Sequence, residues 1–414
     1  MTESTSMKRS IDYDPRSPDV LENPFPTYKK LREETPIQHY DGIPGQPYYI
    51  FLRHADVHNA SANVEEFSAK HGSMPGMGEP MVMMNDGDIH LAFRLIVQGR
   101  FLPRAMAAHT VVLERIVGEL LDRIIAGGPP AELFSSLALP IPVKMTLALL
   151  GVGEEHYEEL AKVADQILGA ALAMLTPEEM AELGRRAPEI FEGWLVEREK
   201  MLEAAGVTDP GPEHVGKVIP DDLVSDVLIG KVEGRRMTRP EMHHFLSVLL
   251  VGGIDTTALL ISNVIWRLLE DRSRWEMVMA DQDRMIPIAI EESLRFDPPG
   301  LGLWRTNAKQ LELYGETIPF KSKIQMSYGS ANRDPRVFSD PDTFRLDRPM
   351  AEMRKHLTFG AGAHLCIGQH LARVEATVAL KALFKRLPTL RLAGPTERTD
   401  NFGFWGRKKL PVAW

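Results

Sequence analysis

The chain has a single cysteine among 414 residues, and this scarcity limits what the protein can be. One thiol excludes an internal disulfide framework and is typical of a protein from a reducing compartment. A zinc site built from several cysteines is excluded for the same reason, and no spaced histidines replace them. The one thiol, Cys366, stands among three glycines in the stretch FGAGAHLCIG, residues 359–368.

Long apolar runs and blocks of one charge are also missing. No stretch reaches the roughly 18 uninterrupted apolar residues of a membrane-spanning helix, and the polar N-terminal stretch lacks the apolar centre of a signal peptide. The net charge is −9, and no cluster of Lys and Arg resembles a nucleic-acid-binding arm. We therefore expect a cytoplasmic protein that neither spans a membrane nor binds nucleic acid.

What remains is the composition of a globular protein, with 44% apolar and 25% charged residues. Aromatic residues are few, at 7%, whereas methionine is abundant, with 20 residues. Methionine fills irregular apolar spaces, so a methionine-rich stretch predicts either core packing or a pocket lining, and the sequence favours neither. The stretch contains Met74, Met77, Met81, Met83 and Met84.

Helical periodicity dominates the chain, and strand patterns are few. No repeat or linker divides it, so we expect one mainly α domain over residues 1–414, with a small β portion and a peripheral extension at 1–23. Helices are expected at 24–34, 54–62, 110–126, 154–175, 189–205, 285–296 and 366–387, strands at 48–52 and within 311–327, and a surface loop at 207–222.

The longest helical pattern runs from Thr238 to about Glu270, roughly 45 Å at 1.5 Å per residue. Thr238 and Glu241 form a capping-box pattern at its start. Its centre reads VGGIDTT, and each interior glycine costs about 1 kcal/mol relative to alanine. Either a helix crosses closely at Gly252 and Gly253, or a flat group lies against them. In the second case a threonine hydroxyl bends the helix and a neighbouring carboxyl relays protons inward.

Two charged features are ambiguous by themselves. Glu292 and Arg295 lie three residues apart on one helix face, a spacing typical of surface salt bridges worth a few tenths of a kcal/mol. Arg305 follows an extended, glycine-bearing segment. It is either an ordinary strand-end residue or a cation directed at an anionic ligand.

The cysteine segment is more specific. Gly360, Gly362 and Gly368 permit positive φ angles and close approach of a neighbouring group. A helix beginning directly after Cys366 is expected to lower the pKa of its thiol, and His364 can reach an anion on the same side. A nucleophilic cysteine remains possible, but no partner base is marked and the glycines stay unexplained. A single thiolate ligand beneath a planar macrocycle, as in haem iron, fits best.

The segment resembles the signature Phe-Gly-x-Gly-x-His-x-Cys-x-Gly of the bacterial cytochrome P-450 haem-thiolate monooxygenases. Further segments agree in order: residues 252–256 with the oxygen-activating helix, Glu292-x-x-Arg295, and 331–349 with the loop before the cysteine. The resemblance extends from about residue 24 to the end. It implies the cytochrome P-450 fold, with haem b between the central helix and the cysteine loop and with Cys366 as the iron ligand.

The resemblance also assigns roles to individual residues. One departure is Asp86-Gly87-Asp88-Ile89, where the family often has Asp-Pro-Pro-Glu, so the entry to the following helix is less rigid. Thr256 and Asp255 are implied as catalytic residues that deliver protons, and Glu292 and Arg295 as structural. The implied cofactor contacts are His90, Arg94, Arg305 and His364 at the propionates, with Gly252, Gly253, Phe359, Cys366 and Gly368, and the implied pocket residues are Met83, Leu249, Gly253, Leu301, Leu303 and Phe404.

The implied reaction is hydroxylation of a hydrophobic small molecule, terpenoid, aromatic or steroid-like, with dioxygen and two electrons. No flavin or nicotinamide motif is present, so an iron–sulfur ferredoxin with its reductase is the expected donor to a monomeric enzyme. A peroxide-driven hydroxylase and a non-catalytic haem sensor or carrier are the alternatives, and neither needs the Asp255–Thr256 pair. The expected ferredoxin-docking cations are Arg94, Arg104, Arg354, Lys355 and Arg373.

Overall fold

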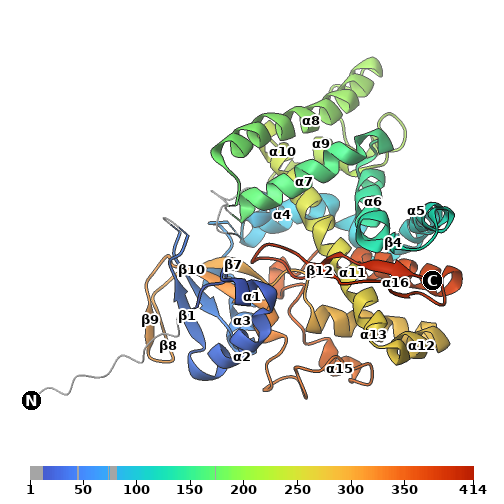
Figure 1. Ribbon diagram of the computed structural model, residues 1–414. Helices are drawn as coiled ribbons and strands as arrows, with labels where there is room; N and C mark the ends of the chain where they lie inside the picture. The colour runs from blue at the N-terminus through green and yellow to red at the C-terminus, as the bar shows by residue number, and fades with distance from the viewer. Residues whose placement is uncertain (1–12, 44–45, 73, 75–81, 173) are drawn as a thin grey trace, which may run out of the picture.

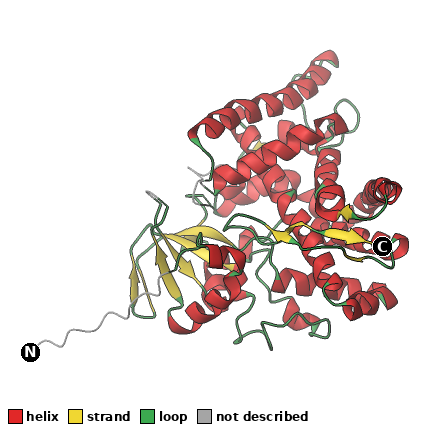
Figure 2. Ribbon diagram, viewed as in Figure 1, coloured by secondary structure: helices red, strands yellow, loops and turns green. Residues whose placement is uncertain are grey.

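The computed structural model describes residues 13–43, 46–72, 74, 82–172 and 174–414. Helices make up most of the molecule, and the larger sheet lies to one side of them beside the N-terminal helices (Figures 1 and 2). This is the mainly α architecture that the periodicity predicted.

The elements have the following bounds. The helices are α1 (Pro18–Glu22), α2 (Pro24–Glu34), α3 (His54–Ala62), α4 (Gly87–Gln98), α5 (Met106–Gly127), α6 (Pro140–Leu150), α7 (Tyr157–Ala171), α8 (Pro177–Ala204), α9 (Leu223–Ile229), α10 (Arg239–Gly253), α11 (Asp255–Leu269), α12 (Arg272–Ala280), α13 (Gln282–Phe296), α14 (Tyr328–Ala331), α15 (Met350–Met353) and α16 (Gln369–Arg386). The strands are β1 (Ile37–Tyr40), β2 (Tyr48–Phe51), β3 (Phe67–Ser68), β4 (Ala131–Glu132), β5 (Lys231–Val232), β6 (Arg235–Arg236), β7 (Gly302–Asn307), β8 (Leu311–Leu313), β9 (Glu316–Ile318), β10 (Lys323–Ser327), β11 (Arg391–Leu392), β12 (Glu397–Arg398), β13 (Arg407–Lys409) and β14 (Pro411–Ala413).

The larger sheet has the strand order β1-β2-β10-β7-β3, with β10 parallel to β2 and antiparallel to β7. Side chains alternate between its faces, so Leu303 and Arg305 of β7 share one face. Trp304 lies between them and is fully buried on the other face. The sheet thereby directs Leu303 and Arg305 toward the helical part of the molecule.

The predicted 238–270 helix is interrupted at one residue. Thr238 and Glu241 form the expected capping box at the start of α10. Ile254, with φ −88° and ψ −74°, separates α10 from α11, immediately after the two glycines. The interruption follows from their low helix propensity. α11 then runs through the middle of the molecule, almost entirely buried (Figure 1).

Among the described residues, the stretch Arg239–Leu269 is long and apolar enough to cross a membrane. Its most apolar window is 61% buried inside the molecule, against other helices and the C-terminal strands. Its apolar character is therefore accounted for by its place in the core.

Several helix boundaries differ from expectation by three or four residues, and the starts of α8 and α16 bear most on the interpretation. α8 begins at Pro177 rather than at residue 189, with a capping box between Thr176 and Glu179. Pro188 lies inside this helix, and an interior proline normally ends a helix, which explains why the pattern misplaced the start. α16 begins at Gln369 because Gly368 is its N-cap, so Cys366 precedes the helix.

Candidate active site

A cavity of about 530 Å³ lies between the central helix and the cysteine segment. Its walls come from α7, α8, α10, α11, β7 and the loop before α16. Elements distant in sequence thus bring many of the expected residues together. Those that line the cavity are Gly252, Thr256, Leu303, Arg305, Phe359, His364, Cys366 and Phe404.

Four expected pocket residues are absent from the described lining, and this corrects the sequence interpretation. Leu301 packs against Gly329 in α14 instead. Gly253 faces Thr146 of α6, with 3.5 Å between the position of a Cβ and Thr146 Oγ1. In both cases the backbone conformation sets the direction in which the residue faces. The other two are Leu249 and Met83.

Neighbouring residues take the places of those two. Val248 and Val251 of α10 line the cavity, and Leu249 points elsewhere because successive helical residues are rotated by about 100°. Met84 and Met74 line it in place of Met83. Both interpretations of the methionine-rich stretch therefore hold for part of it, and Met77 and Met81 lie outside the described residues.

The cysteine loop has the backbone that its glycines predicted. Gly360 and Gly362 have φ angles of +73° and +69°. A side chain at Gly362 is excluded, since its Cβ would lie 2.7 Å from the Cα of Ala62. The Cys366 amide donates to the Phe359 carbonyl oxygen at 2.8 Å, which closes the loop. Gly368 does not have a positive φ but ends the loop as the N-cap of α16.

The pKa of the Cys366 thiol is raised, not lowered as the sequence predicted. Burial is the largest cause, and it outweighs the backbone N–H groups of Gly368 and Gln369 and the charges of Arg94 and Arg373. The donors that would hold a thiolate are in place, but they do not ionise the half-buried thiol by themselves. A coordinated metal ion deprotonates such a thiol.

Asp255 and Thr256 are the first two residues of α11, directly after the interruption at Ile254. The Thr256 hydroxyl donates to the Gly252 carbonyl oxygen at 2.9 Å, and Thr256 also lines the cavity. Asp255 is 7% exposed, and its Oδ2 has no hydrogen-bond partner among the described residues. Burial raises the pKa of this carboxyl, and Asp165 adds to the rise while Lys408 opposes it. The pair therefore places a cavity-facing hydroxyl next in the sequence to a buried carboxyl whose pKa is raised.

Two cations at the cysteine end have no carboxylate partner among the described residues. Arg305 is 4% exposed, its Nη1 donates to the Trp304 carbonyl oxygen at 3.0 Å, and its Nε is unpaired. Arg94 is half-buried and forms no ion pair within the same part of the chain. Burial lowers the pKa of both guanidinium groups. Buried, unpaired guanidinium groups are costly and indicate an anionic ligand.

The two histidines of this end are partly engaged. His364 Nε2 lies 3.1 Å from Asp86 Oδ1, and the rings of His364 and His90 are 4.1 Å apart between centroids. His90 contacts the carbonyl oxygens of Met83 and Ala363 at 3.0 and 3.2 Å. Asp86, the residue of this segment that agrees with the family pattern, therefore anchors the loop that carries His364.

These residues fit haem b. The macrocycle needs a flat, apolar space against a helix, a thiolate on one face and cations for two carboxylates. Gly252 has nothing within 4 Å of its Cβ position, so the helix is open toward the cavity at this residue. Cys366 lines the same cavity, and Arg305 and His364 lie at its edge. The donor set thus matches the group that the signature implied.

Glu292 and Arg295 are not a surface pair but a buried one, with both side chains fully buried. Arg295 binds both carboxylate oxygens of Glu292, at 2.7 and 2.8 Å, and Arg348 adds a third contact at 3.1 Å. Arg295 also donates to the Asn332 carbonyl oxygen, and Asn332 Nδ2 donates to Thr358 Oγ1, next to the cysteine loop. The pair therefore braces that loop.

Arg373 is already occupied within the fold. Its guanidinium lies on Glu291, with 2.5 Å between Nε and Oε1, and stacks 4.5 Å from the centre of the Phe359 ring. Arg104, Arg354 and Lys355 are exposed and form no ion pairs among the described residues. Arg373 thus supports the cysteine loop, and sequence alone did not distinguish it from the free cations.

His244 of α10 lines the cavity, and the sequence analysis did not select it. The signal was available, because residues 244, 248 and 251 are spaced as one face of a helix. A histidine within an apolar helix is ambiguous until the neighbouring helices are placed.

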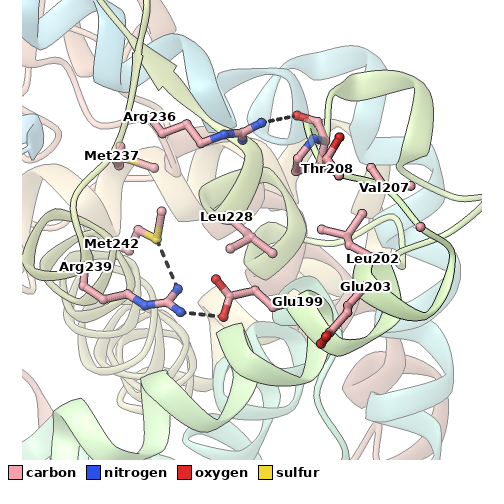
Figure 3. Close-up of a pocket in the computed structure, with 12 residues that line it drawn as sticks. Glu199, Leu202, Glu203, Val207, Thr208, Leu228, Arg236, Met237, Arg239 and Met242 are labelled. Carbon is pink, nitrogen blue, oxygen red and sulfur yellow. Dashed lines mark hydrogen bonds and ion pairs between the residues drawn. The ribbon is translucent and has the colours of Figure 1, made fainter.

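A second cavity, of about 680 Å³, lies between the C-terminal part of α8 and the start of α10 (Figure 3). Arg239 binds Glu199 at 2.6 Å, and Arg236 binds Asp209 at 2.6 Å. The arginines that line it are thus neutralised by neighbouring carboxylates, and the chemistry-bearing residues of the sequence lie in the other cavity.

Comparisons with known proteins agree with this geometry. The family model for Cytochrome P450 matches residues 176–392. Nocardicin C N-oxygenase of Nocardia uniformis is 32% identical over 94% of this chain and 95% of its own. The 6-deoxyerythronolide B hydroxylase of Saccharopolyspora erythraea is 30% identical over 89% of both chains.

A solved structure supports the same assignment. P450BioI in complex with hexadec-9Z-enoic acid ligated acyl carrier protein superposes with a TM-score of 0.82, at 25% identity, over 96% of this chain and 100% of that one. The chain belongs to the cytochrome P450 family and is a haem b monooxygenase.

Proposed function

We propose that the enzyme hydroxylates an uncharged, apolar small molecule in the part of the 530 Å³ cavity that the haem leaves free, using dioxygen and two electrons from a ferredoxin. The observation that carries this proposal is the distribution of polarity along the cavity. Arg305, the charged side chain of the described lining, lies at the Cys366 end, whereas the end between α7, α8 and α10 is mainly aliphatic, with His244 and Ser247 as its polar residues. The aliphatic residues of this aliphatic end are Ile167, Ala170, Ala171, Leu183, Ala187, Val248 and Val251.

The names of the relatives support a bulky organic substrate for this enzyme but do not identify it. Their names refer to nocardicin C and 6-deoxyerythronolide B, and the structural neighbour holds a fatty acid on a carrier protein. These molecules differ in charge and shape. Terpenoid, aromatic and steroid-like molecules are the classes that suit the aliphatic end of this cavity.

The residues have separate tasks in this proposal. When bound, haem supplies an iron that activates dioxygen, with Cys366 as its protein ligand. Thr256 presents a hydroxyl at the open part of the central helix, and Asp255 passes protons to it from the side of Lys408 and Asp165. Gly252 leaves room for the macrocycle, and the cations near Arg305 take its carboxylates.

The electron donor is inferred from charge. Arg104, Arg354 and Lys355 are exposed cations without an internal partner among the described residues, and they suit an acidic ferredoxin. Arg94 is half-buried and serves the cofactor first. A single-domain, monomeric, cytoplasmic enzyme without membrane or nucleic-acid partners remains the prediction.

Carbon monoxide binding tests the cofactor assignment. The reduced holoprotein is expected to give the red-shifted Soret absorption of a thiolate-ligated haem. The Cys366→Ser variant should lose that shift, and Thr377→Ala on α16 is a control that should retain it. A wild-type protein without the shift contradicts the assignment of Cys366.

Reconstitution tests the reaction. Product is expected when ferredoxin, its reductase and NADH are supplied with a hydrocarbon that shifts the spin state of the haem. Product from hydrogen peroxide at a higher rate supports the peroxide-driven alternative. Reduction without product for all ligands that shift the spin state supports a sensor or carrier.

A further inference from the structure

His244 lies at the aliphatic end of the active-site cavity. It belongs to α10, one turn before Val248, and both residues line the cavity. Ile167 of α7 and Leu183 of α8 line the same cavity. An imidazole is therefore placed in a cavity that has aliphatic side chains from α7, α8 and α10.

The imidazole of His244 has no hydrogen-bond partner within the part of the chain that the structure describes. Its Nδ1 is buried and unpaired. The neighbouring polar side chains of α10 are satisfied: His243 Nε2 lies 3.0 Å from Glu192 Oε2, and Ser247 donates to the His243 carbonyl oxygen at 3.0 Å. His244 is thus the unsatisfied polar group of this helix segment.

Such a group calls for a partner from the cavity. Burial lowers the pKa of His244 to about 4, so the ring is neutral near pH 7 and offers one donor and one acceptor. A buried polar group without a partner costs free energy, which a ligand can recover by hydrogen bonding to it. A neutral ring pairs with a hydroxyl or a carbonyl and does not demand a charge.

The position along the helix sets a length. From His244 to Gly253, the end of α10, the rise is about 14 Å at 1.5 Å per residue, and Thr256 lies beyond the interruption at Ile254. Thr256 marks the place of oxidation, because it lies beside the open turn at Gly252. A molecule that touches both ends must be extended.

On the basis of the proposed function, we propose that His244 is the specificity-determining anchor of the substrate. The substrate is an elongated, apolar molecule with an uncharged hydroxyl or carbonyl group at the end remote from the oxidised carbon. His244 binds that group by a hydrogen bond, which selects the molecule and its orientation.

A molecular ruler tests this proposal on the holoenzyme. The probes are 1-alkylimidazoles and their ω-hydroxy counterparts, with chains from hexyl to tetradecyl. Their imidazole binds the haem iron, and the absorption change gives the Kd of each. The hydroxyl is expected to tighten binding about fivefold at one chain length, the effect of one net hydrogen bond, and to weaken it at shorter lengths.

Three variants complete the test. His244→Leu should abolish the length-specific gain, and His244→Gln, which keeps a donor and an acceptor, should retain part of it. His243→Leu is the matched control and should leave the gain unchanged, since its imidazole contacts Glu192. A gain that survives in His244→Leu, or no gain at any length in the wild type, overturns the anchor. Failure of every imidazole to bind iron contradicts the proposed function instead.

Discussion

The Thr256 hydroxyl donates a hydrogen bond to the Gly252 carbonyl oxygen at 2.9 Å, at the turn where the central helix is interrupted. A threonine hydroxyl that bonds to the carbonyl one turn earlier tends to bend a helix, and here the bond spans the interruption at Ile254. The bond holds a hydroxyl at the cavity wall, directly beside the buried carboxyl of Asp255. The start of α11 and the proposed proton relay thus involve the same two adjacent residues, Asp255 and Thr256.

Thr256→Ala is expected to keep the haem but to divert electrons from product to hydrogen peroxide. Loss of a positioned proton donor should lower product formed per NADH by about a hundredfold. Product and peroxide are measured against NADH consumed. Thr256→Ser, which keeps the hydroxyl, is the matched control, and tightly coupled turnover in Thr256→Ala would count against the role.

Removing the Glu292 carboxylate should destabilise the whole protein. Glu292→Ala leaves Arg295 and Arg348 buried without their counter-charge, at a cost of about 3–5 kcal/mol in the free energy of unfolding. Urea titration measures the change. Glu276→Ala removes an exposed pair with Arg272 and should change that free energy by less than about 1 kcal/mol. Equal effects would contradict the bracing role.

His244 should contribute to the pH dependence of stability. Its pKa is about 4 in the folded state and 6.5 as the ordinary value, so above pH 6.5 the ring is neutral in both states and proton binding does not favour unfolding. The stability then falls as the pH drops from 6.5 through 4, by about 3 kcal/mol in all. Between pH 7 and 4, wild-type protein should therefore lose more stability than His244→Gln. Parallel curves would refute the burial effect.

Arg305→Met should have opposite effects on the two forms of the protein. In the apoprotein it removes a buried, unpaired guanidinium and should stabilise the fold by about 1–3 kcal/mol. In the holoprotein it removes a cation from the propionates, so haem should transfer faster to a scavenging apoglobin. Denaturation of the apoprotein and the transfer rate measure the two effects. Unchanged haem transfer would exclude Arg305 from cofactor binding.

Charge reversal at Arg354 should slow electron transfer. Arg354→Glu removes an exposed cation, so the second-order rate of reduction by an acidic ferredoxin should fall at low ionic strength and recover at high salt. Arg185→Glu, on α8 at the opposite end of the molecule from α15, is the control (Figure 1). If both variants respond alike, Arg354 is not one of the ferredoxin-docking cations.

Local signals predicted the central features of the site. The positive φ angles of Gly360 and Gly362 and the capping box at Thr238 depend on neighbouring residues alone, so the sequence showed them. The interior proline of α8 was the exception. Pro188 lies where the sequence pattern indicates a break, but in the folded molecule α8 continues through it.

The orientation of a side chain and its burial could be determined only from the folded structure. Leu301 and Leu303 are near neighbours in an apolar segment, yet Leu303 lines the cavity and Leu301 packs on Gly329. Arg373 and Arg354 are both cations near the cysteine loop, and Glu291 engages the former. Such differences arise from elements distant in the chain.

From the amino-acid order alone came the expectation that Cys366 is the iron ligand, its glycine-shaped loop and the weak centre of the long helix, because each depends on residues close together in the chain. Tertiary structure decided that the Cys366 thiol has a raised pKa, that Glu292 is buried and that His244 reaches the cavity. Solvent exclusion is a property of the assembled helices, and no local pattern contains it.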